Sequence, residues 1–158
     1  MKLSKKELII FIVTVIVIIG GYYGTKCYIN NRYGYYVVEG ESMLPNIQNN
    51  QEVKVDKYKK ISRYDIVVID VGNHEIIKRV IGLPGDTLKF TKDDKLYIND
   101  EEIAYSFEII GKTRIIDEEI TLDYQFYYVL GDNRDNAYDS RTFGKVSKSQ
   151  IVGVVVNK

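Results

Sequence analysis

The chain has 158 residues, of which 45% are hydrophobic and 28% charged, a composition typical of a folded protein rather than a disordered one. Its 22 basic and 22 acidic side chains cancel, so no excess of positive charge indicates binding to nucleic acid. A single cysteine excludes an intrachain disulfide, and one cysteine with one histidine argues against a zinc site. The length predicts one domain with an appendage, and we expect neither a metal nor a cofactor.

The amino-terminal stretch is the appendage. Residues 8–19 are apolar apart from Thr14, and the stretch extends to residue 29 if the Lys26 side chain reaches the membrane surface. We therefore predict a transmembrane anchor at residues 8–29, after a short tail at residues 1–7.

Three alternatives compete with an anchor. A cleaved secretory signal would share the length and the basic start, but no small-x-small cleavage site follows the stretch. A buried core helix is disfavoured because the helix would carry Ile and Val on all of its faces, which favours contact with lipid. Lipid attachment at Cys27 is disfavoured because Lys26 directly precedes it.

Basic residues flank the stretch unevenly. Lys2, Lys5 and Lys6 precede it, whereas Lys26 and Arg32 follow it. The positive-inside rule then predicts a cytoplasmic amino terminus, with the rest of the chain outside the membrane.

The remainder of the chain, residues 30–158, has a strand-like pattern without helical periodicity. Short apolar or alternating runs are separated by turns, such as those at 92–94 and 99–100. We predict an all-β, antiparallel domain. Its expected strands are 35–38, 52–56, 65–69, 76–81, 87–90, 95–98, 126–130 and 151–156.

Residues 87–122 are more charged and richer in turns than the blocks around them. They predict a small inserted β-subdomain, with a pair of ordinary hairpins as the alternative.

Ser42 lies between two expected strands in the segment Gly-Glu-Ser-Met-Leu-Pro at 40–45. On residue type alone, Ser42 is either an ordinary turn residue or a nucleophile. The apolar Met-Leu pair after the serine is unusual for an exposed turn. A nucleophilic serine requires a base that accepts its proton.

Two residues are candidates for that base. His74 falls in an expected hairpin turn, where a solvated role is favoured over a catalytic one. Lys78 falls in an expected strand, on the same face as Ile76 and Val80, where an apolar setting favours the neutral amine.

Strand alternation gives Arg79 the same apolar setting on the other face, beside Ile77 and Ile81. Arginine does not deprotonate, however, so chemistry favours Lys78. A lysine must lose about 3 pKa units from its reference value near 10.4 to act as a base at neutral pH.

The segment 131–141 is a dense polar loop after an apolar strand. A cation site is one interpretation, but calcium-loop spacing is missing, and an ion pair between Asp139 and Arg141 is favoured. Leu-Pro-Gly-Asp at 83–86 predicts a type II turn.

Four blocks together resemble the type I signal peptidase family, in its compact Gram-positive form. They occur in the family's order behind one anchor, and the resemblance covers essentially the whole chain. The blocks are 40–45, Tyr-Asp-Ile-Val-Val at 64–68, Lys-Arg-Val-Ile-Gly-Leu-Pro-Gly-Asp at 78–86, and Gly-Asp-Asn-Arg-Asp-Asn-Ala-Tyr-Asp-Ser-Arg-Thr-Phe-Gly at 131–144.

The resemblance implies a membrane-bound serine endopeptidase that removes signal peptides after a small-x-small motif through an acyl-enzyme. It assigns catalysis to Ser42 as nucleophile and Lys78 as base, with the Ser42 N–H as an oxyanion donor. It assigns substrate binding to Val38, Met43, Ile47 and Ile77. The residues expected to support the site are Gly40, Arg79, Gly131, Asp132, Asn133, Arg134, Asp139, Ser140 and Arg141.

Three positions depart from the pattern of many members. Gly40 lacks a hydroxyl that can complete the oxyanion hole, although glycine is familiar in Gram-positive members. Ala137 stands where many members have a serine that hydrogen-bonds the lysine. Asn46 replaces a common threonine.

The implied partners are preprotein signal peptides and the lipid bilayer of a bacterial cell, close to the secretion translocon. We expect a monomer that binds no nucleic acid. Two other hypotheses are a self-cleaving serine–lysine domain of the SOS-repressor type and an inactive β-domain that only binds exported peptides. The hydrophobic anchor argues against the first, and the presence of both Ser42 and Lys78 argues against the second.

Overall fold

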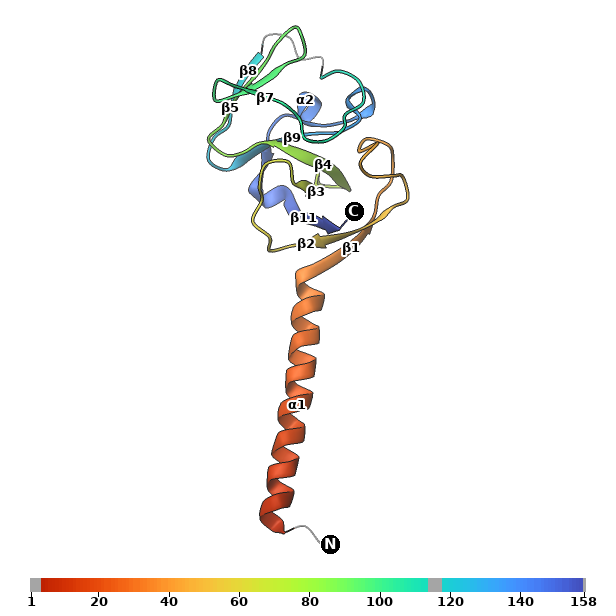
Figure 1. Ribbon diagram of the computed structural model, residues 1–158, viewed down its shortest axis with the longest axis vertical. Helices are drawn as coiled ribbons and strands as arrows, with labels where there is room; N and C mark the ends of the chain where they lie inside the picture. The colour runs from red at the N-terminus through yellow and green to blue at the C-terminus, as the bar shows by residue number, and fades with distance from the viewer. Residues whose placement is uncertain (1–3, 114–117, 158) are drawn as a thin grey trace. The chain divides into compact units, whose positions relative to one another are not determined.

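The computed structural model describes residues 4–113 and 118–157, and the chain divides into two compact units, Met1–Gly34 and Tyr35–Lys158. The first unit contains helix α1 and the first two residues of strand β1, and the second contains the rest of β1 and the other β-strands (Figure 1).

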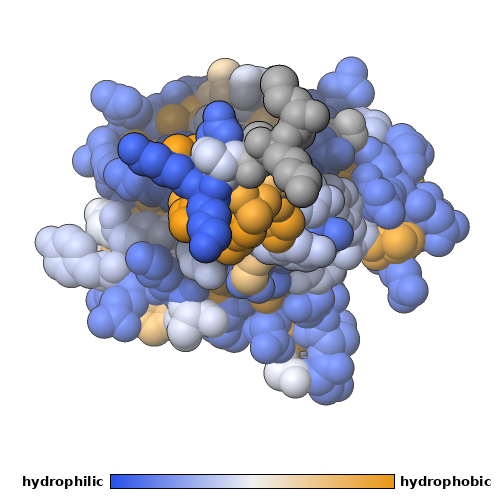
Figure 2. Space-filling model, turned by 90° about the horizontal axis from the view of Figure 1, so that it is seen from below, coloured by the Kyte–Doolittle hydropathy of each residue, from blue (hydrophilic) through white to orange (hydrophobic). Residues whose placement is uncertain are grey.

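Helix α1 spans Lys5–Arg32 and contains the predicted anchor. Its start is fixed by a capping box, in which Ser4 Oγ accepts from Glu7 N–H and Glu7 Oε2 accepts from Ser4 N–H. Its 28 residues span roughly 42 Å at 1.5 Å per residue, so the helix is long and apolar enough to cross a membrane. The helix buries no residue, and hydrophobic side chains show behind its hydrophilic first turn (Figure 2).

Seven strands form the main sheet, in the order β1-β2-β11-β3-β4-β9-β10. The registers from β2 to β10 are all antiparallel, as predicted. In that order the strands span Tyr33–Val37, Glu52–Asp56, Ile151–Asn157, Ile66–Asp70, Glu75–Gly82, Phe126–Leu130 and Val146–Ser147.

Four strands within residues 87–103 and 118–121 form a separate antiparallel sheet in the order β7-β6-β5-β8, which provides the expected β insertion. Asn99 and Asp100 adopt positive φ angles of 53° and 69° in the tight turn between β6 and β7. The four strands span Glu101–Ile103, Leu96–Ile98, Thr87–Phe90 and Glu118–Thr121.

Strand β3 is buried on both faces, which explains its continuous apolar sequence. Val68 belongs to the core cluster that contains Val38 and Met43, whereas Val67 belongs to the cluster that contains Val80. A third cluster joins the two sheets. It consists of Ile81, Leu88, Phe90, Leu96, Ile98, Leu122, Tyr128 and Leu130.

The sequence showed no helical periodicity after residue 30, so the short helix α2 was missed, and so were three strands. Helix α2 spans only Ser140–Phe143, too short to show helical periodicity, and its Asp139 cap accepts from Arg141 N–H. Strands β7, β8 and β10 are two to four residues long and carry charged or polar residues, so they show no apolar alternation.

The shared core predicts that the small sheet contributes to the stability of the whole β unit. Phe90→Ala, at a residue only 2% exposed, should lower the free energy of unfolding by about 3–5 kcal/mol in chemical denaturation. Tyr124→Ala, at a residue 90% exposed, is the control and should change it by less than about 0.5 kcal/mol. Equal effects of the two substitutions would contradict the shared core.

Candidate active site

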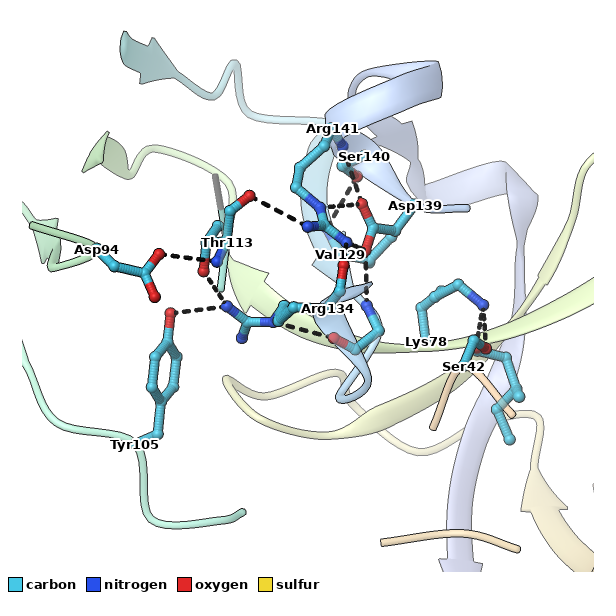
Figure 3. A network of polar contacts seen from close by, with 12 residues as sticks. Ser42, Lys78, Asp94, Tyr105, Thr113, Val129, Arg134, Asp139, Ser140 and Arg141 are labelled. Carbon is cyan, nitrogen blue, oxygen red and sulfur yellow. Dashed lines mark hydrogen bonds and ion pairs between the residues drawn. The ribbon is translucent and has the colours of Figure 1, made fainter. Parts of the chain in front are cut away.

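Ser42 and Lys78, which lie 36 positions apart in the chain, meet in the folded β unit. Lys78 Nζ donates to Ser42 Oγ over 2.8 Å, and to the Ile77 carbonyl over 2.7 Å (Figure 3). Ser42 lies in the loop after β1, and Lys78 in the middle of β4. Ser42 Oγ thus has Lys78, rather than His74, as its hydrogen-bond partner.

The environment of Lys78 shifts its amine towards the neutral form. The side chain is 4% exposed, and this burial lowers the pKa of Lys78 from 10.5 to about 8. The negative charges of Asp139 and Asp132 oppose the shift but do not cancel it. At neutral pH an appreciable fraction of Lys78 is therefore able to accept a proton.

The loop that follows β9 holds the serine in place. Asn133 N–H donates to the Ser42 carbonyl over 3.0 Å, and Asn133 Nδ2 donates to the Glu41 carbonyl over 3.2 Å. A Cβ at Gly131 would lie 2.7 Å from the Ser42 carbonyl oxygen and would overlap Ala137. Glycine at 131 is therefore required by a close approach of two backbones.

Arg79 is buried like Lys78 but is committed to an ion pair. Its Nε and Nη2 donate to the two carboxylate oxygens of Asp132 over 2.8 and 2.5 Å. The guanidinium also lies 4.0 Å from the centre of the Phe107 ring. Asn46, whose role the sequence left open, donates to the same carboxylate over 3.0 Å and so connects it to the serine loop.

The predicted ion pair between Asp139 and Arg141 is present at 2.8 Å. Asp139 also accepts from Gly131 N–H over 2.9 Å, and Ser140 Oγ accepts from Val129 N–H over 3.0 Å. These contacts fix the end of β9 to α2.

Arg134 connects this loop to the chain between β7 and β8. Its Nε donates to the Gly131 carbonyl, and its Nη1 contacts the Tyr105 hydroxyl and Thr113 Oγ1 (Figure 3). Arg141 Nη1 donates to the Thr113 carbonyl over 3.1 Å. No group of three or more His, Cys, Asp or Glu side chains in the described ranges could hold a metal ion.

A cleft of about 450 Å³ opens beside Ser42 and Lys78. Of the four predicted substrate-binding residues, Val38 and Ile77 line it. Met43 and Ile47 instead lie in the core cluster next to Val38, with 1% and 0% of their surface exposed.

Sequence reasoning missed other lining residues, namely Tyr36, Val37, Glu39, Val68, Glu75 and Ile76, and it did not place the exposed His74 at the cleft. Tyr36 lies two positions before Val38, so in an extended chain both side chains point to the same face. This spacing was the available signal for Tyr36.

One edge of β4 is open beside this cleft. Residues 75–78 pair with β3, whereas the described pairing with β9 begins only at Arg79. The other side of the 75–78 backbone pairs with no strand of the described chain, and only the Ile77 carbonyl is known to be used, by Lys78 Nζ. An extended peptide has room to pair along this side.

Gly40 adopts a φ angle of 96°, a left-handed conformation that favours glycine. Its N–H donates to Asn49 Oδ1 over 2.9 Å. This backbone requirement gives a physical reason for glycine where some members carry a hydroxyl.

The comparisons with known proteins agree with the four sequence blocks. The family model described as "Signal peptidase, peptidase S26" matches residues 5–157. Signal peptidase I V of Bacillus subtilis (strain 168) is 40% identical over 138 residues, which cover 76% of this chain and 82% of that protein. Signal peptidase I of Bacillus caldolyticus is 37% identical over 138 residues, covering 76% and 75%.

A crystal structure of a signal peptidase I from Enterococcus faecalis V583 has a similar fold. Its TM-score is 0.53 at 31% identity, over 62% of this chain and 98% of that chain. The predicted fold class is confirmed, and the matches define the protein class as a serine endopeptidase. The chain belongs to the signal peptidase family, peptidase S26, as the four blocks predicted.

The buried ion pair provides a test of what holds the site. Asp132→Ala would leave Arg79 buried without its carboxylate, and it should lower the free energy of unfolding by about 3–5 kcal/mol in chemical denaturation. Asp123→Ala removes the exposed partner of Lys145 and should cost at most about 1 kcal/mol. A loss at Asp132 no larger than that at Asp123 would contradict the structural role of the pair.

Proposed function

We propose that this protein is a membrane-anchored signal peptidase that cleaves signal peptides from exported preproteins, with Ser42 as nucleophile and Lys78 as general base. The observation that carries the proposal is the 2.8 Å contact between Ser42 Oγ and the buried Lys78 Nζ. The family match supports the reaction class, because its relatives are signal peptidases.

In the proposed mechanism, neutral Lys78 takes the proton from Ser42 Oγ as the oxygen attacks the scissile carbonyl carbon. The developing oxyanion accepts a hydrogen bond from Ser42 N–H, which donates to no described residue. Protonated Lys78 then gives its proton to the leaving amine, and an acyl-enzyme remains. Lys78 next deprotonates a water that attacks the ester, and the returning proton restores Ser42.

The cleft supports recognition of an extended peptide. The free edge of residues 75–78 offers backbone pairing, and Val38 and Ile77 offer apolar walls for side chains near the cut. These apolar walls would accept the small side chains at the first and third substrate positions before the cut. Met43 and Ile47 would support the wall of the cleft indirectly, because they pack in the core cluster that contains Val38.

Helix α1 is proposed to anchor the enzyme in the bacterial cell membrane through residues 8–29, with a cytoplasmic tail at 1–7 and an extracytoplasmic catalytic domain at 30–158. We further propose that it acts as a monomer close to the secretion translocon. Lys5 and Lys6 ahead of the apolar stretch support this orientation.

Substitution of either member of the dyad tests the mechanism. In detergent, cleavage of a preprotein after a small-x-small motif should fall about a thousandfold or more in Ser42→Ala and Lys78→Ala. Lys78→Arg should be equally inactive because arginine stays protonated. Lys89→Ala, at an exposed residue of β5, should cleave at the wild-type rate. Undiminished cleavage by Ser42→Ala would refute the assignment.

The pH dependence follows from the lowered pKa of Lys78. Because the active base is the neutral amine, kcat/KM should rise about tenfold per pH unit below pH 8 and level off above it. A steady-state profile with a full-length preprotein measures this. A rate that continues to rise towards pH 10.5 would show that burial does not shift Lys78.

A reporter tests the topology. Alkaline phosphatase, which is active only outside the cytoplasm, should be active when fused after Lys158 and inactive when fused before the apolar stretch. The opposite pattern would overturn the proposed orientation.

A further inference from the structure

A second pocket, of about 410 Å³, shares no lining residue with the cleft that contains Ser42. It lies where the chain between β2 and β3 meets the start of β11. Its lining residues are Lys57, Tyr58, Lys59, Lys60, Ile61, Tyr127, Lys148, Ile151 and Gly153.

The lining of this pocket is strongly cationic in a chain whose net charge is zero. Four lysines line it and no acidic residue does. Lys59 pairs with Asp65 at 2.9 Å, but Lys57, Lys60 and Lys148 form no ion pair with any residue in 4–113 or 118–157. Three uncompensated positive charges around one concave surface favour an anion.

Tyr127 adds an independent sign of a ligand. It lines the pocket with only 7% of its surface exposed, and its ring packs in the core cluster with Val129 and Val146. Its hydroxyl makes no hydrogen bond with a described residue, and the hydroxyl oxygen remains partly accessible to solvent or a ligand. Burial raises the pKa of Tyr127, so the hydroxyl remains a protonated donor.

We propose that this pocket binds a phosphate group, with Lys57, Lys60 and Lys148 providing the charge and Tyr127 Oη donating a hydrogen bond. Lysine ammonium groups and a hydroxyl supply donors from several directions, which suits the several acceptor oxygens of a phosphate. The phosphate is either that of a soluble phosphoester or the headgroup of an anionic lipid. The inference does not depend on the proposed peptidase mechanism.

Reactivity of individual lysines tests the site directly. The full chain is treated with an amine-acylating reagent, and mass spectrometry measures the labelling rate of each lysine. One arm uses detergent-solubilised protein with sn-glycerol 3-phosphate or inorganic phosphate. The other uses lipid nanodiscs of phosphatidylcholine with or without phosphatidylglycerol. Lys89 and Lys112, which are exposed and outside the pocket, serve as internal controls.

The midpoint is the ligand concentration that gives half of the full protection. At about ten times this concentration, labelling of Lys57, Lys60 and Lys148 should slow at least about threefold, while labelling of Lys89 and Lys112 stays unchanged. Protection by dissolved phosphate assigns a soluble source, and protection only by phosphatidylglycerol assigns the lipid. Tyr127→Phe keeps the ring and should raise the midpoint about fivefold.

Three results would overturn the proposal. One is protection of Lys89 and Lys112 equal to that of the pocket lysines, which would indicate plain charge attraction. Another is the absence of protection in both arms. The third is an unchanged midpoint in Tyr127→Phe.

Discussion

The desolvation of one lysine is the constraint on which the rest of the β unit depends. A lysine at its ordinary pKa is protonated at neutral pH and cannot take a proton from a serine. Placing Lys78 inside β4, with 4% of its surface exposed, lowers its pKa to about 8 and keeps its amine 2.8 Å from Ser42 Oγ. Two buried carboxylates nearby, Asp132 and Asp139, act in the opposite direction and raise the pKa of Lys78, and each of them has a closer cation as its partner.

The closer cations are arginines. Arg79 occupies both oxygens of Asp132, and Arg141 pairs with Asp139. The loop that carries these carboxylates also binds the Ser42 carbonyl through Asn133. The same loop therefore carries the carboxylates that the two arginines pair with, and it also fixes the nucleophile. This dual role explains why a polar segment lies against the core.

Much of this arrangement was readable from the sequence, because strong periodicity and turn chemistry are local. Strands 52–56, 87–90 and 126–130 have the predicted bounds. Alternation put Lys78 and Arg79 on opposite faces but could not tell base from ion-pair partner. Residue chemistry favoured Lys78 as the base, because arginine does not deprotonate. The ion pair of Arg79 with Asp132, 53 positions away, is a tertiary contact that no local pattern encodes. The buried positions of Met43 and Ile47 are likewise tertiary facts.

The most direct test of the account is the titration of Lys78 itself. Selective isotope labelling of the lysine side chains, with NMR detection, follows its amine in the Ser42→Ala protein, where no turnover interferes. Burial predicts a midpoint near pH 8, well below those of exposed lysines such as Lys89. A midpoint near 10.5, together with those of the exposed lysines, would contradict the central claim.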